Sequence, residues 1–478
     1  MPAAASVFDR LGAAYRALRG LDAAGSTRRW RDIPQPRAEA SYVSAGAGIV
    51  AARAAAFVLN NSTGARIAQV LPDQLVGTGI VPRPAHPVEA VRTALARSFS
   101  AWVDQADADG RCDFFGIQLG LVRDMVVLGE GLGICTADAA TGTPQLRRLH
   151  PEQLDRSKTI RLDSGRLINQ GVEFDAFGRI AAYWIRPSLA GDALAGLALP
   201  AERWPASDVI HMFKPLFAGQ VRGLSWLAPV LMPAKSVESL IDAMLQRAKV
   251  AAMHAAFITM PDGEPLPYDG EQTGTELDVG WDPGAMVVLR PGEDVKFAEP
   301  PDAGNVPAFA SSMLRMIAAA TGMAFEQLSG DYSQVNYSSA RAALLEFRRF
   351  AGSIQHQVIV FQMCRPVWRR FLLWQVLSGR ISAGAFQSGQ DDFMAVKWLP
   401  PKWDWVDPMK DAQAAILEID NRLTSRSQVV AERGYDIEEL DREIAADQAR
   451  LEKLNIAPVP KSAPAPTVPV EAPANADS

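Results

Sequence analysis

Apolar and polar residues follow two different periods along the chain. Between about residues 41 and 125, apolar residues recur at every third or fourth position, which predicts helices. From about 125 to 217 the apolar runs become short, which predicts strands. The clearest case is Val172–Phe174 followed by Ile180–Ile185, with a turn at 175–178 between them. The pattern therefore predicts an α+β chain that is mainly helical.

Residues that break regular structure refine this first part. Asn60–Gly64 interrupts two apolar-periodic runs and predicts a break between two helices. Val76–Ile80 leads into Pro82 and Pro84, and this segment predicts a loop. Val209–Phe213 predicts one further strand.

The middle of the chain predicts two helices that flank an acidic insert. Apolar residues spaced three or four apart predict helices over residues 226–258 and 305–321. Residues 259–304 between them hold eleven Asp or Glu and two basic residues, a local charge of −9, and fourteen of these 46 residues are Pro or Gly. Within this insert, residues 286–289 and 295–297 predict a hairpin.

A polar loop and a long helix follow. Gly322 predicts the end of the preceding helix, and residues 327–339 predict the loop. A helical pattern then runs over residues 338–378, where Pro366 predicts a kink. The charge of this helix is strongly biased, because Glu346 stands alone against a set of arginines: Arg341, Arg348, Arg349, Arg365, Arg369 and Arg370.

The two ends of the chain differ from its middle. Residues 409–454 predict a pair of helices around a turn at Gly434. Residues 1–40 mix apolar and charged positions and are interpreted as a loosely held terminal arm. The final residues, 456–478, are rich in Pro and Ala and predict a disordered tail.

The composition narrows the possible functions. The chain carries 48 basic and 54 acidic side chains, a formal charge of −6, whereas proteins that grip nucleic acid through its phosphates are usually basic. Three cysteines cannot build a disulfide scaffold, which fits a reducing cytosol. Charged residues among the first twenty argue against a signal peptide, and the lack of a long uninterrupted apolar run argues against a membrane span.

A search for catalytic motifs is mostly negative. The chain has no Gly-Lys pair, so it lacks the phosphate-binding loop of many ATPases, and its five histidines are scattered without the spacing of a zinc site. Gly129–Gly133 lacks the spacing of a dinucleotide site and predicts a tight turn. Ser225 lacks the second glycine of a nucleophile elbow.

Two alternatives remain open at this point. The densest polar cluster is Asp331–Tyr337, and an enzyme would be a hydrolase that uses Asp331 with Tyr332 or Tyr337. No general acid–base pair of known spacing supports it. The other alternative is a helical adaptor or scaffold protein without a DNA channel.

Several segments together resemble a known family. Leu328–Glu346 resembles the most recognisable segment of the lambda-family phage portal proteins. Ala51–Asn61 departs from that family, because it is rich in alanine where the family has a more charged helix. Five further segments resemble the family in the same order along the chain: Gln69–Gly79, Gly171–Tyr183, Ile210–Pro229, Pro401–Pro408 and Ser425–Asp436.

The resemblance implies an architecture. Portal proteins form a ring, usually of twelve subunits, around an axial DNA channel at one vertex of the capsid, and each subunit has a wing, stem, clip and crown. In this chain the implied parts are an N-terminal arm 1–40, a wing 41–225, stem helices 226–258 and 305–322 around a clip 259–304, a tunnel loop 323–338, a long wing helix with its following segment 339–406, a crown 407–455 and the tail 456–478.

The resemblance also implies three groups of functional residues. The tunnel loop would present polar side chains to DNA: Gln327, Asp331, Tyr332, Ser333, Gln334, Asn336 and Tyr337. The clip would dock terminase and adaptor proteins through its acids: Asp269, Glu271, Glu276, Asp278, Asp282, Glu293 and Asp294. Basic residues of the long helix would make subunit contacts: Arg341, Arg348 and Arg349. These arginines could equally be solvated or paired within the chain, and the clip acids could simply keep a loop soluble.

The implied role is structural. The family carries no catalytic residue, metal or cofactor, and its packaging motor is a separate terminase. The implied partners are further copies of the chain, the major capsid protein or a scaffold, the terminase large subunit, head-completion and tail connector proteins, and double-stranded DNA in transit, with no membrane. The implied location is the vertex of the procapsid and mature head, after assembly in the cytoplasm of the bacterial host. An acidic chain suits a channel, because many Lys or Arg contacts to phosphates would hold the DNA.

Overall fold

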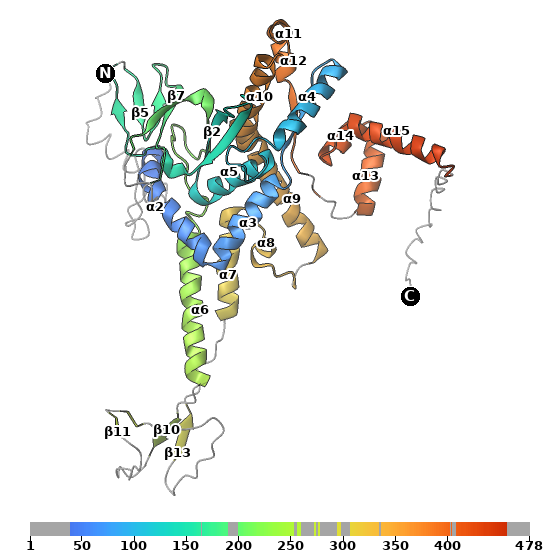
Figure 1. Cartoon of the computed structure of the whole chain (residues 1–478). Helices are drawn as coiled ribbons and strands as arrows, with labels where there is room; N and C mark the ends of the chain where they lie inside the picture. The colour runs from blue at the N-terminus through green and yellow to red at the C-terminus, as the bar shows by residue number, and fades with distance from the viewer. Residues whose placement is uncertain are drawn as a thin grey trace, which may run out of the picture. The chain divides into compact units, whose positions relative to one another are not determined.

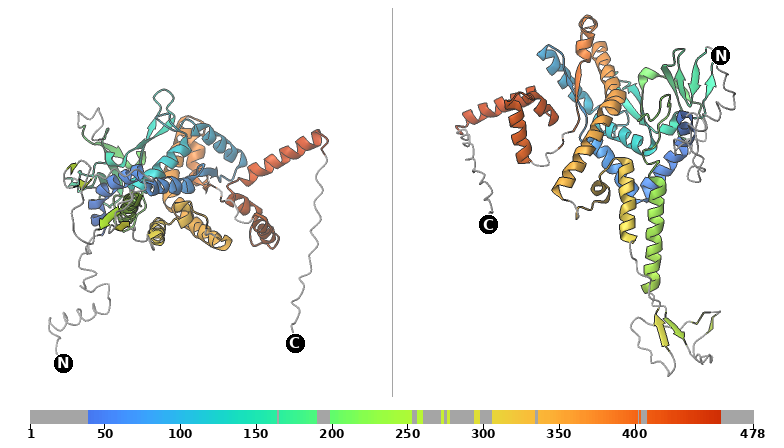
Figure 2. Two further views of the ribbon diagram at one scale, coloured as in Figure 1. Left: turned by 90° about the horizontal axis from the view of Figure 1, so that it is seen from below. Right: turned by 180° about the vertical axis from the view of Figure 1, so that it is seen from behind.

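The computed structural model, drawn as a ribbon in Figures 1 and 2, describes most of the chain. The chain divides into two compact units. The described residues are 39–163, 165–189, 199–252, 256–259, 272–273, 276–277, 294–297, 306–333, 336–401, 403 and 408–456. Unit 1 holds residues up to 71, 121–134 and 148–334, and unit 2 holds 72–120, 135–147 and the residues from 335 onward. The predicted N-terminal arm and C-terminal tail lie outside the described residues, apart from Glu39, Ala40 and Ile456.

Two helices open the described chain. Helix α2 (Glu39–Asn60) and helix α3 (Ser62–Val76) are separated by Asn61 alone, so the predicted break is confirmed. The Asn61 side chain accepts hydrogen bonds from the N–H groups of Thr63 and Gly64, which caps α3. Val43–Asn60 in α2 is long and apolar enough to cross a membrane by length and composition, and 22% of it is buried. One such helix is weak evidence for a membrane span, because helices of soluble proteins pass the same test.

The strands predicted between residues 125 and 217 form the sheets of unit 1. The larger sheet follows chain order: β4 (Ile160–Arg161), β5 (Leu167–Asn169), β6 (Val172–Phe174), β7 (Ile180–Ile185) and β8 (Glu202–Pro205). The β6–β7 pair is antiparallel, with Val172 opposite Tyr183, which confirms the predicted hairpin.

A second layer covers this sheet. Strand β2 (Gly131–Ala137) pairs antiparallel with β9 (Val209–Met212) through Gly131–Ile134, which confirms the strand predicted at 209–213. Side chains of both layers form one apolar core: Leu132, Ile134, Leu149, Leu154, Val172, Tyr183, Ile185 and Val209. Short helices η2 (Pro151–Gln153) and η3 (Ala206–Asp208) link the layers. Strand β2 continues to Ala137 and is followed in the chain by β3 (Pro144–Leu149). The order of strands in this sheet is β3, β2, β9.

The two helices of the predicted stem, α6 (Leu231–Ala252) and α7 (Val306–Thr321), lie side by side (Figure 1). The second was predicted almost to the residue, but the helix predicted over 226–258 is wrong at both ends. Its last residues instead form strand β10 (Ala256–Thr259), because Phe257, Ile258 and Thr259 favour a pleated backbone.

The insert between these helices contains strands. β10 pairs antiparallel with β13 (Asp294–Phe297), and β11 (Gln272–Thr273) pairs with β12 (Glu276–Leu277). The strand predicted at 295–297 is confirmed, and its observed partner is β10. The other predicted hairpin strand, 286–289, lies outside the described residues.

The long helix of unit 2 is built from three pieces: α9 (Tyr337–Ile354), the π-helical segment η4 (Gln355–Cys364) and α10 (Arg365–Leu377). Pro366 lies in the first turn of α10, directly after η4. In a π-helical turn, hydrogen bonds join residues five apart instead of four. The N–H that proline lacks is therefore missing at a point where the hydrogen-bond pattern changes anyway. The helix thus changes type directly before Pro366, the residue at which the sequence predicts a kink.

Aromatic side chains form the core of unit 2. Phe99 and Trp102 of α4 (Glu89–Val103) meet Phe114 at the start of α5 (Phe114–Leu128) and Phe371 of α10, with ring centres 5.1–5.8 Å apart. The indole N–H of Trp102 donates to the Pro144 carbonyl at 2.7 Å, which satisfies its only polar group.

The loop predicted around Pro82 and Pro84 is wrong, because Val81–Pro84 forms strand β1. It pairs antiparallel with β14 (Val396–Leu399) in a two-stranded ribbon. In the chain, β14 comes directly after the short helices α11 (Ala383–Ser388) and α12 (Gln390–Met394). Proline is tolerated in such an edge strand, where its missing N–H faces away from the partner.

The C-terminal part of unit 2 has three helices, α13 (Pro408–Asp420), α14 (Arg426–Glu432) and α15 (Ile437–Lys453). Gly434, with φ +77°, joins α14 to α15, so the predicted pair around this glycine is confirmed. We name residues 408–456 the C-terminal helices.

Candidate functional site

The loop after α7 is shorter than predicted, because α8 (Phe325–Ser329) occupies its start. Gln327, predicted in the loop, lies inside this helix, and its side chain accepts a hydrogen bond from the Ala324 N–H at 3.0 Å. Gly322 and Gly330 both have positive φ, +77° and +72°, and end α7 and α8. The irregular segment therefore begins after Ser329.

Two contacts from neighbouring helices hold α8 in place. Arg66 of α3 donates from Nε to the Gln327 carbonyl at 3.0 Å. The Arg315 guanidinium of α7 lies over the Phe325 ring, 4.8 Å from its centre. Because Leu328 is also buried, the base of the loop is fixed to the body of unit 1.

Beyond this base, unit 1 leaves a polar segment open to solvent. Asp331, Tyr332 and Ser333 are all exposed, the Tyr332 side chain at 61%. Asp331 accepts a hydrogen bond from the Ser333 N–H at 2.9 Å, and the hydrogen bonds from Ser333 lower the pKa of Asp331. The carboxylate is thus charged at neutral pH. Gln334 lies outside the described residues.

In unit 2 the segment ends at a helix cap. The Asn336 side chain accepts from the Ser339 N–H at 2.8 Å and caps α9. Tyr337 is the first residue of α9. The side-chain oxygen of Asn336 is therefore engaged by the helix terminus.

The acidic insert is described only in part. Of its seven singled-out acids, Glu276 lies in β12 and Asp294 in β13, and the other five lie outside the described residues: Asp269, Glu271, Asp278, Asp282 and Glu293.

The three arginines singled out on the long helix have different surroundings. Arg341 donates from Nη2 to Asp411 of α13 at 3.3 Å, within the same chain. The Arg348 guanidinium lies over Trp403, 5.6 Å from the ring centre. Arg349 is exposed. The single chain thus already uses Arg341 and Arg348, and leaves Arg349 available to solvent.

Sequence reasoning missed the most deeply buried pair of opposite charges among the described residues. Glu130, which precedes β2, and Arg222, which precedes the stem helix α6, are both fully buried. Arg222 donates to the Glu130 carboxylate from Nη2 at 2.6 Å and from Nε at 2.8 Å. It also donates to three backbone carbonyls, those of Pro151, Leu154 and Gln170. We name the Glu130–Arg222 pair the stem anchor.

Neighbouring groups complete the stem anchor. The Gly223 N–H donates to Glu130, and His211 Nε2 lies 3.7 Å from the carboxylate. Burial raises the pKa of Glu130, but the charge of the buried Arg222 and its hydrogen bonds to the carboxylate outweigh burial and hold that pKa well below its usual value. Glu130 is therefore an anion whose charge is neutralised inside the protein.

Glycine permits this arrangement. A Cβ on Gly223 would lie 2.0 Å from the Gly129 carbonyl oxygen, and a Cβ on Gly129 would lie 2.6 Å from the backbone of Leu224 and Ser225. The tight turn predicted over Gly129–Gly133 is wrong in its second half, because Gly131–Gly133 belong to strand β2, whereas Gly129 before them has a φ of +94°. The signal for this site was present in the two Gly-flanked charges, Glu130 and Arg222, but 92 residues separate them.

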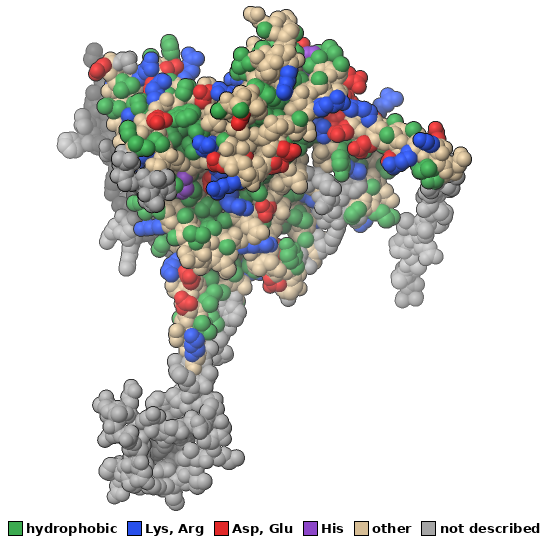
Figure 3. Space-filling view, in the orientation of Figure 1, with side chains coloured by type: hydrophobic (Ala, Val, Ile, Leu, Met, Phe, Trp, Pro, Cys, Tyr) green, Lys and Arg blue, Asp and Glu red, His purple; other side chains and the backbone are tan. Residues whose placement is uncertain are grey.

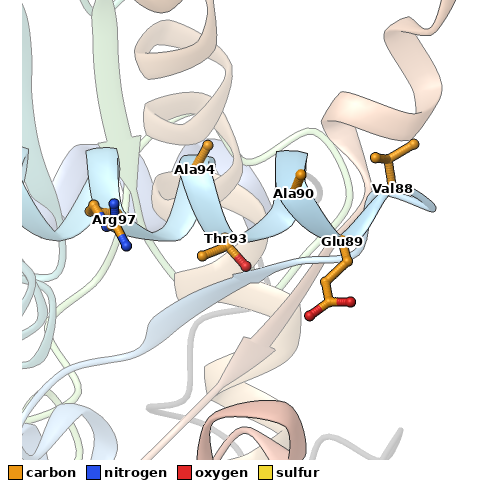
Figure 4. Close-up of a pocket in the computed structure, with 6 residues that line it drawn as sticks. All are labelled: Val88, Glu89, Ala90, Thr93, Ala94 and Arg97. Carbon is orange, nitrogen blue, oxygen red and sulfur yellow. The ribbon is translucent and has the colours of Figure 1, made fainter. Parts of the chain in front are cut away.

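Among the described residues, no other feature suggests a ligand site. No group of three or more His, Cys, Asp or Glu could hold a metal ion there. A surface depression of about 590 Å³ lies on one face of α4 (Figure 4), and its lining is drawn from that helix and the residue before it: Val88, Glu89, Ala90, Thr93, Ala94 and Arg97. Groups on a single helix face do not converge on a substrate.

Comparison with curated sequences gives consistent relatives. The chain is 28% identical over 323 residues to a probable portal protein of Halomonas phage phiHAP-1, covering 65% of this chain and 61% of that protein, which is less than two thirds of its length. It is 26% identical to portal protein B of Escherichia phage lambda, covering 81% of each chain. The portal protein of Escherichia phage N15 is also 26% identical, with 81% of this chain and 82% of that protein covered.

Solved structures give weaker similarity. A chain from the neck of a native gene transfer agent particle, computed with C12 symmetry, aligns with a TM-score of 0.46 and 13% identity, covering 84% of this chain and 94% of that chain. An HK97-family phage portal protein from Corynebacterium diphtheriae aligns with a TM-score of 0.32 and 12% identity, covering 62% and 84%.

The family assignment rests on the sequence match. The model of the family described as phage portal protein, lambda family, matches residues 24–355, which is more than half of the chain. The resemblance stated from the sequence is thereby confirmed, and with it a structural role in the phage head instead of an enzymatic one. The chain belongs to the lambda family of phage portal proteins.

Proposed function

We propose that this chain assembles into a closed ring of about twelve copies at one vertex of the phage head. Double-stranded DNA passes through its axial channel during packaging and ejection. Terminase docks on the ring first, and head-completion or tail connector proteins follow. Assembly takes place in the cytoplasm of the bacterial host.

The observation that carries the ring is the exposed apolar surface of the stem. Met232, Ile241 and Leu245 of α6 and Phe309 and Met316 of α7 are each more than half exposed in the single chain. Figure 3 shows hydrophobic side chains along the outside of the stem. Covering a large apolar side chain contributes about 1.5–3 kcal/mol. Contacts between the stems of successive copies would bury these side chains on both faces.

The ring can be tested by native mass spectrometry of the purified full-length chain. We expect an oligomer near twelve subunits, and weaker assembly when Ile241→Asp and Met316→Asp are combined. The matched control is Ser239→Asp, which places the same charge at an exposed polar position of α6. A monomer that persists at micromolar concentration under all salt conditions would contradict the proposal.

The charge of the chain supports passage of DNA without retention. With a net charge of −6, acidic side chains outnumber basic ones in every copy, so duplex binding at physiological salt should fall in the weak non-specific range, around 10⁻⁴–10⁻⁶ M. Sequence-specific nanomolar binding would favour a regulator over a channel. The purified chain should also show no ATP hydrolysis, since the motor is a separate terminase.

The segment from Asp331 to Asn336 is proposed as the part that meets DNA in the channel. Its exposed charge at Asp331 would repel phosphate, and exposed Tyr332 and Ser333 would give brief contacts. Deleting 331–335 leaves α8 with its Gly330 cap, and the Asn336 cap of α9, in place. Rings should form with an almost unchanged melting temperature, while heads built from them should package DNA poorly or fail to retain it. Normal packaging and retention would show that this segment has no part in moving or holding DNA.

The acidic insert 259–304 is proposed as the docking surface for terminase and adaptors. Its local charge of −9 would attract a basic partner surface and make docking dependent on salt. Replacing Glu293 and Asp294 with Gln and Asn should lower the association rate of the terminase large subunit without changing ring formation. An unchanged rate at low salt would show that these charges only keep the insert soluble.

A further inference from the structure

In the described part of the chain, the long helix of unit 2 has one face that is exposed to solvent. Residues 347–390 contain six arginines and no Asp or Glu. Along η4 and α10 the exposed positions recur every four residues: Phe361, Arg365, Arg369, Leu373 and Leu377. We name these five residues the α10 stripe. Its ends are apolar, with Phe361 60% and Leu377 87% exposed, and its centre is cationic.

The guanidinium groups of this stripe are available. Arg365 lies over the Phe361 ring at 5.6 Å from its centre, which leaves the N–H edge of the guanidinium free to bind a carboxylate. Arg369 has no ion-pair partner among the described residues of the chain. The opposite side of α10 is buried and includes Trp368, Phe371 and Leu372, so the helix itself is held firmly.

Helix α15 offers the complementary pattern. Its residues from 441 onward are all exposed, and neither α13 nor α15 contains a buried residue. Apolar side chains flank two carboxylates along one side of α15: Leu440, Glu443, Asp447, Leu451 and Leu454. Successive members of this α15 stripe are three or four residues apart, so they share one face of the helix.

Laid side by side, the two stripes match over three positions: Phe361 meets Leu440, Arg365 meets Glu443 and Arg369 meets Asp447. Because each step of four residues turns about 40° around a helix of 3.6 residues per turn, Leu373 lies farther round α10 and meets Leu451 at the edge of the contact, and Leu377 lies beyond it. At 1.5 Å per residue, the α10 stripe from Arg365 to Leu377 spans about 18 Å and the α15 stripe from Glu443 to Leu454 spans about 16 Å.

The chain's own α15 does not cover its own α10. Glu439 of α15 binds Arg83 of β1 at 2.8 Å, and Glu438 binds Arg92 of α4 at 2.7 Å. With α15 held there, residues 441–456 remain exposed. Asp447 has only an exposed ion pair with Arg450 three residues on, which is weak enough to exchange.

We infer that α15 of one copy docks on the α10 stripe of a second copy, through two Arg–carboxylate pairs flanked by apolar contacts. This inference rests on the proposed function in that it requires copies to assemble. It gives the C-terminal helices the packing that one chain does not provide, and it links successive copies through α10 as well as through the stem.

Charge exchange tests the pairing in the full-length chain. Reversing the charge of the α10 stripe with Arg365→Glu and Arg369→Glu together should raise the protein concentration at which half of the chains are assembled about tenfold. This is the effect expected for the loss of two partly exposed ion pairs. Reversing Glu443→Arg with Asp447→Arg should do the same, and the four changes together should restore assembly. Arg161→Glu, the same reversal at an exposed residue of β4, is the control and should change nothing.

A covalent test identifies the occupant. In a Cys112→Ser background, which removes the exposed native thiol, Leu373→Cys with Leu451→Cys should give a ladder of disulfide-linked copies on oxidation. Rings without a ladder, and insensitive to the charge reversals, would overturn the inference and leave the proposed ring standing. Charge reversals that spare rings but block entry into heads would assign the stripe to an acidic head protein instead. A wild-type chain that forms no oligomer would overturn both proposals.

Discussion

Removing the charge of Glu130 should destabilise the chain strongly although the substitution preserves shape. Glu130→Gln leaves Arg222 fully buried without its counter-ion, at a point where β2 and the run into α6 meet. Breaking one partner of a buried ion pair costs about 3–5 kcal/mol, because the remaining charge is desolvated and uncompensated. For a unit of this size, the cost corresponds to a fall in melting temperature of about 10 °C.

The neighbouring contacts make this cost hard to avoid. Arg222 also donates to the carbonyls of Pro151, Leu154 and Gln170, so the guanidinium cannot turn toward solvent without leaving those acceptors unsatisfied. An apolar replacement of both partners, Glu130→Leu with Arg222→Met, should for the same reason recover only part of the loss.

The effect should depend on pH in a defined direction. The folded-state pKa of Glu130 lies below its unfolded value, so the stabilisation is complete above about pH 4.3 and is lost as the pH falls through the folded value. The difference in stability between wild type and Glu130→Gln should therefore be constant near neutral pH and shrink as the pH is lowered below about 4.3.

Thermal unfolding followed by circular dichroism between pH 7 and pH 3 tests both the loss of stability and its dependence on pH. Glu238→Gln is the matched control, because Glu238 forms an exposed pair with Lys235 at 3.0 Å, where loss of charge costs less than about 1 kcal/mol. Equal melting temperatures for wild type and Glu130→Gln at pH 7 would refute the reasoning, as would a loss no larger than that of the control.

Two smaller changes test the local geometry. Gly223→Ala should cost more than about 3 kcal/mol in unfolding experiments, because its Cβ would lie 2.0 Å from the Gly129 carbonyl oxygen, whereas Gly46→Ala in α2 has open space and should stabilise by about 0.5–1 kcal/mol. The opposite order of stabilities would contradict the close approach. Asn336→Ala removes the hydrogen bond to the Ser339 N–H and should cost about 1 kcal/mol by denaturant unfolding, with Asn336→Asp close to wild type.

Much of the element order could be predicted from the sequence, because it depends on local periodicity. The helix α7 and its stop at Gly322, the β6–β7 hairpin and the turn at Gly434 all follow from spacings within a few residues. The family was also accessible from ordered motifs, and the acidic insert from composition alone. These features need no information about distant parts of the chain.

Tertiary structure decided the features that depend on distant partners. Val81–Pro84 became a strand only because β14, more than 300 residues later, supplies its hydrogen bonds. The π-helical segment before Pro366, with six of its ten residues buried, was likewise not predicted from the sequence. A buried charge such as Glu130 is tolerated only where a counter-ion is brought to it, and Arg222 arrives from another part of the chain. The local spacing of residues predicts which segments can form a helix or a strand. Which strands pair and which charges meet depends on desolvation and packing between segments that are far apart in the sequence.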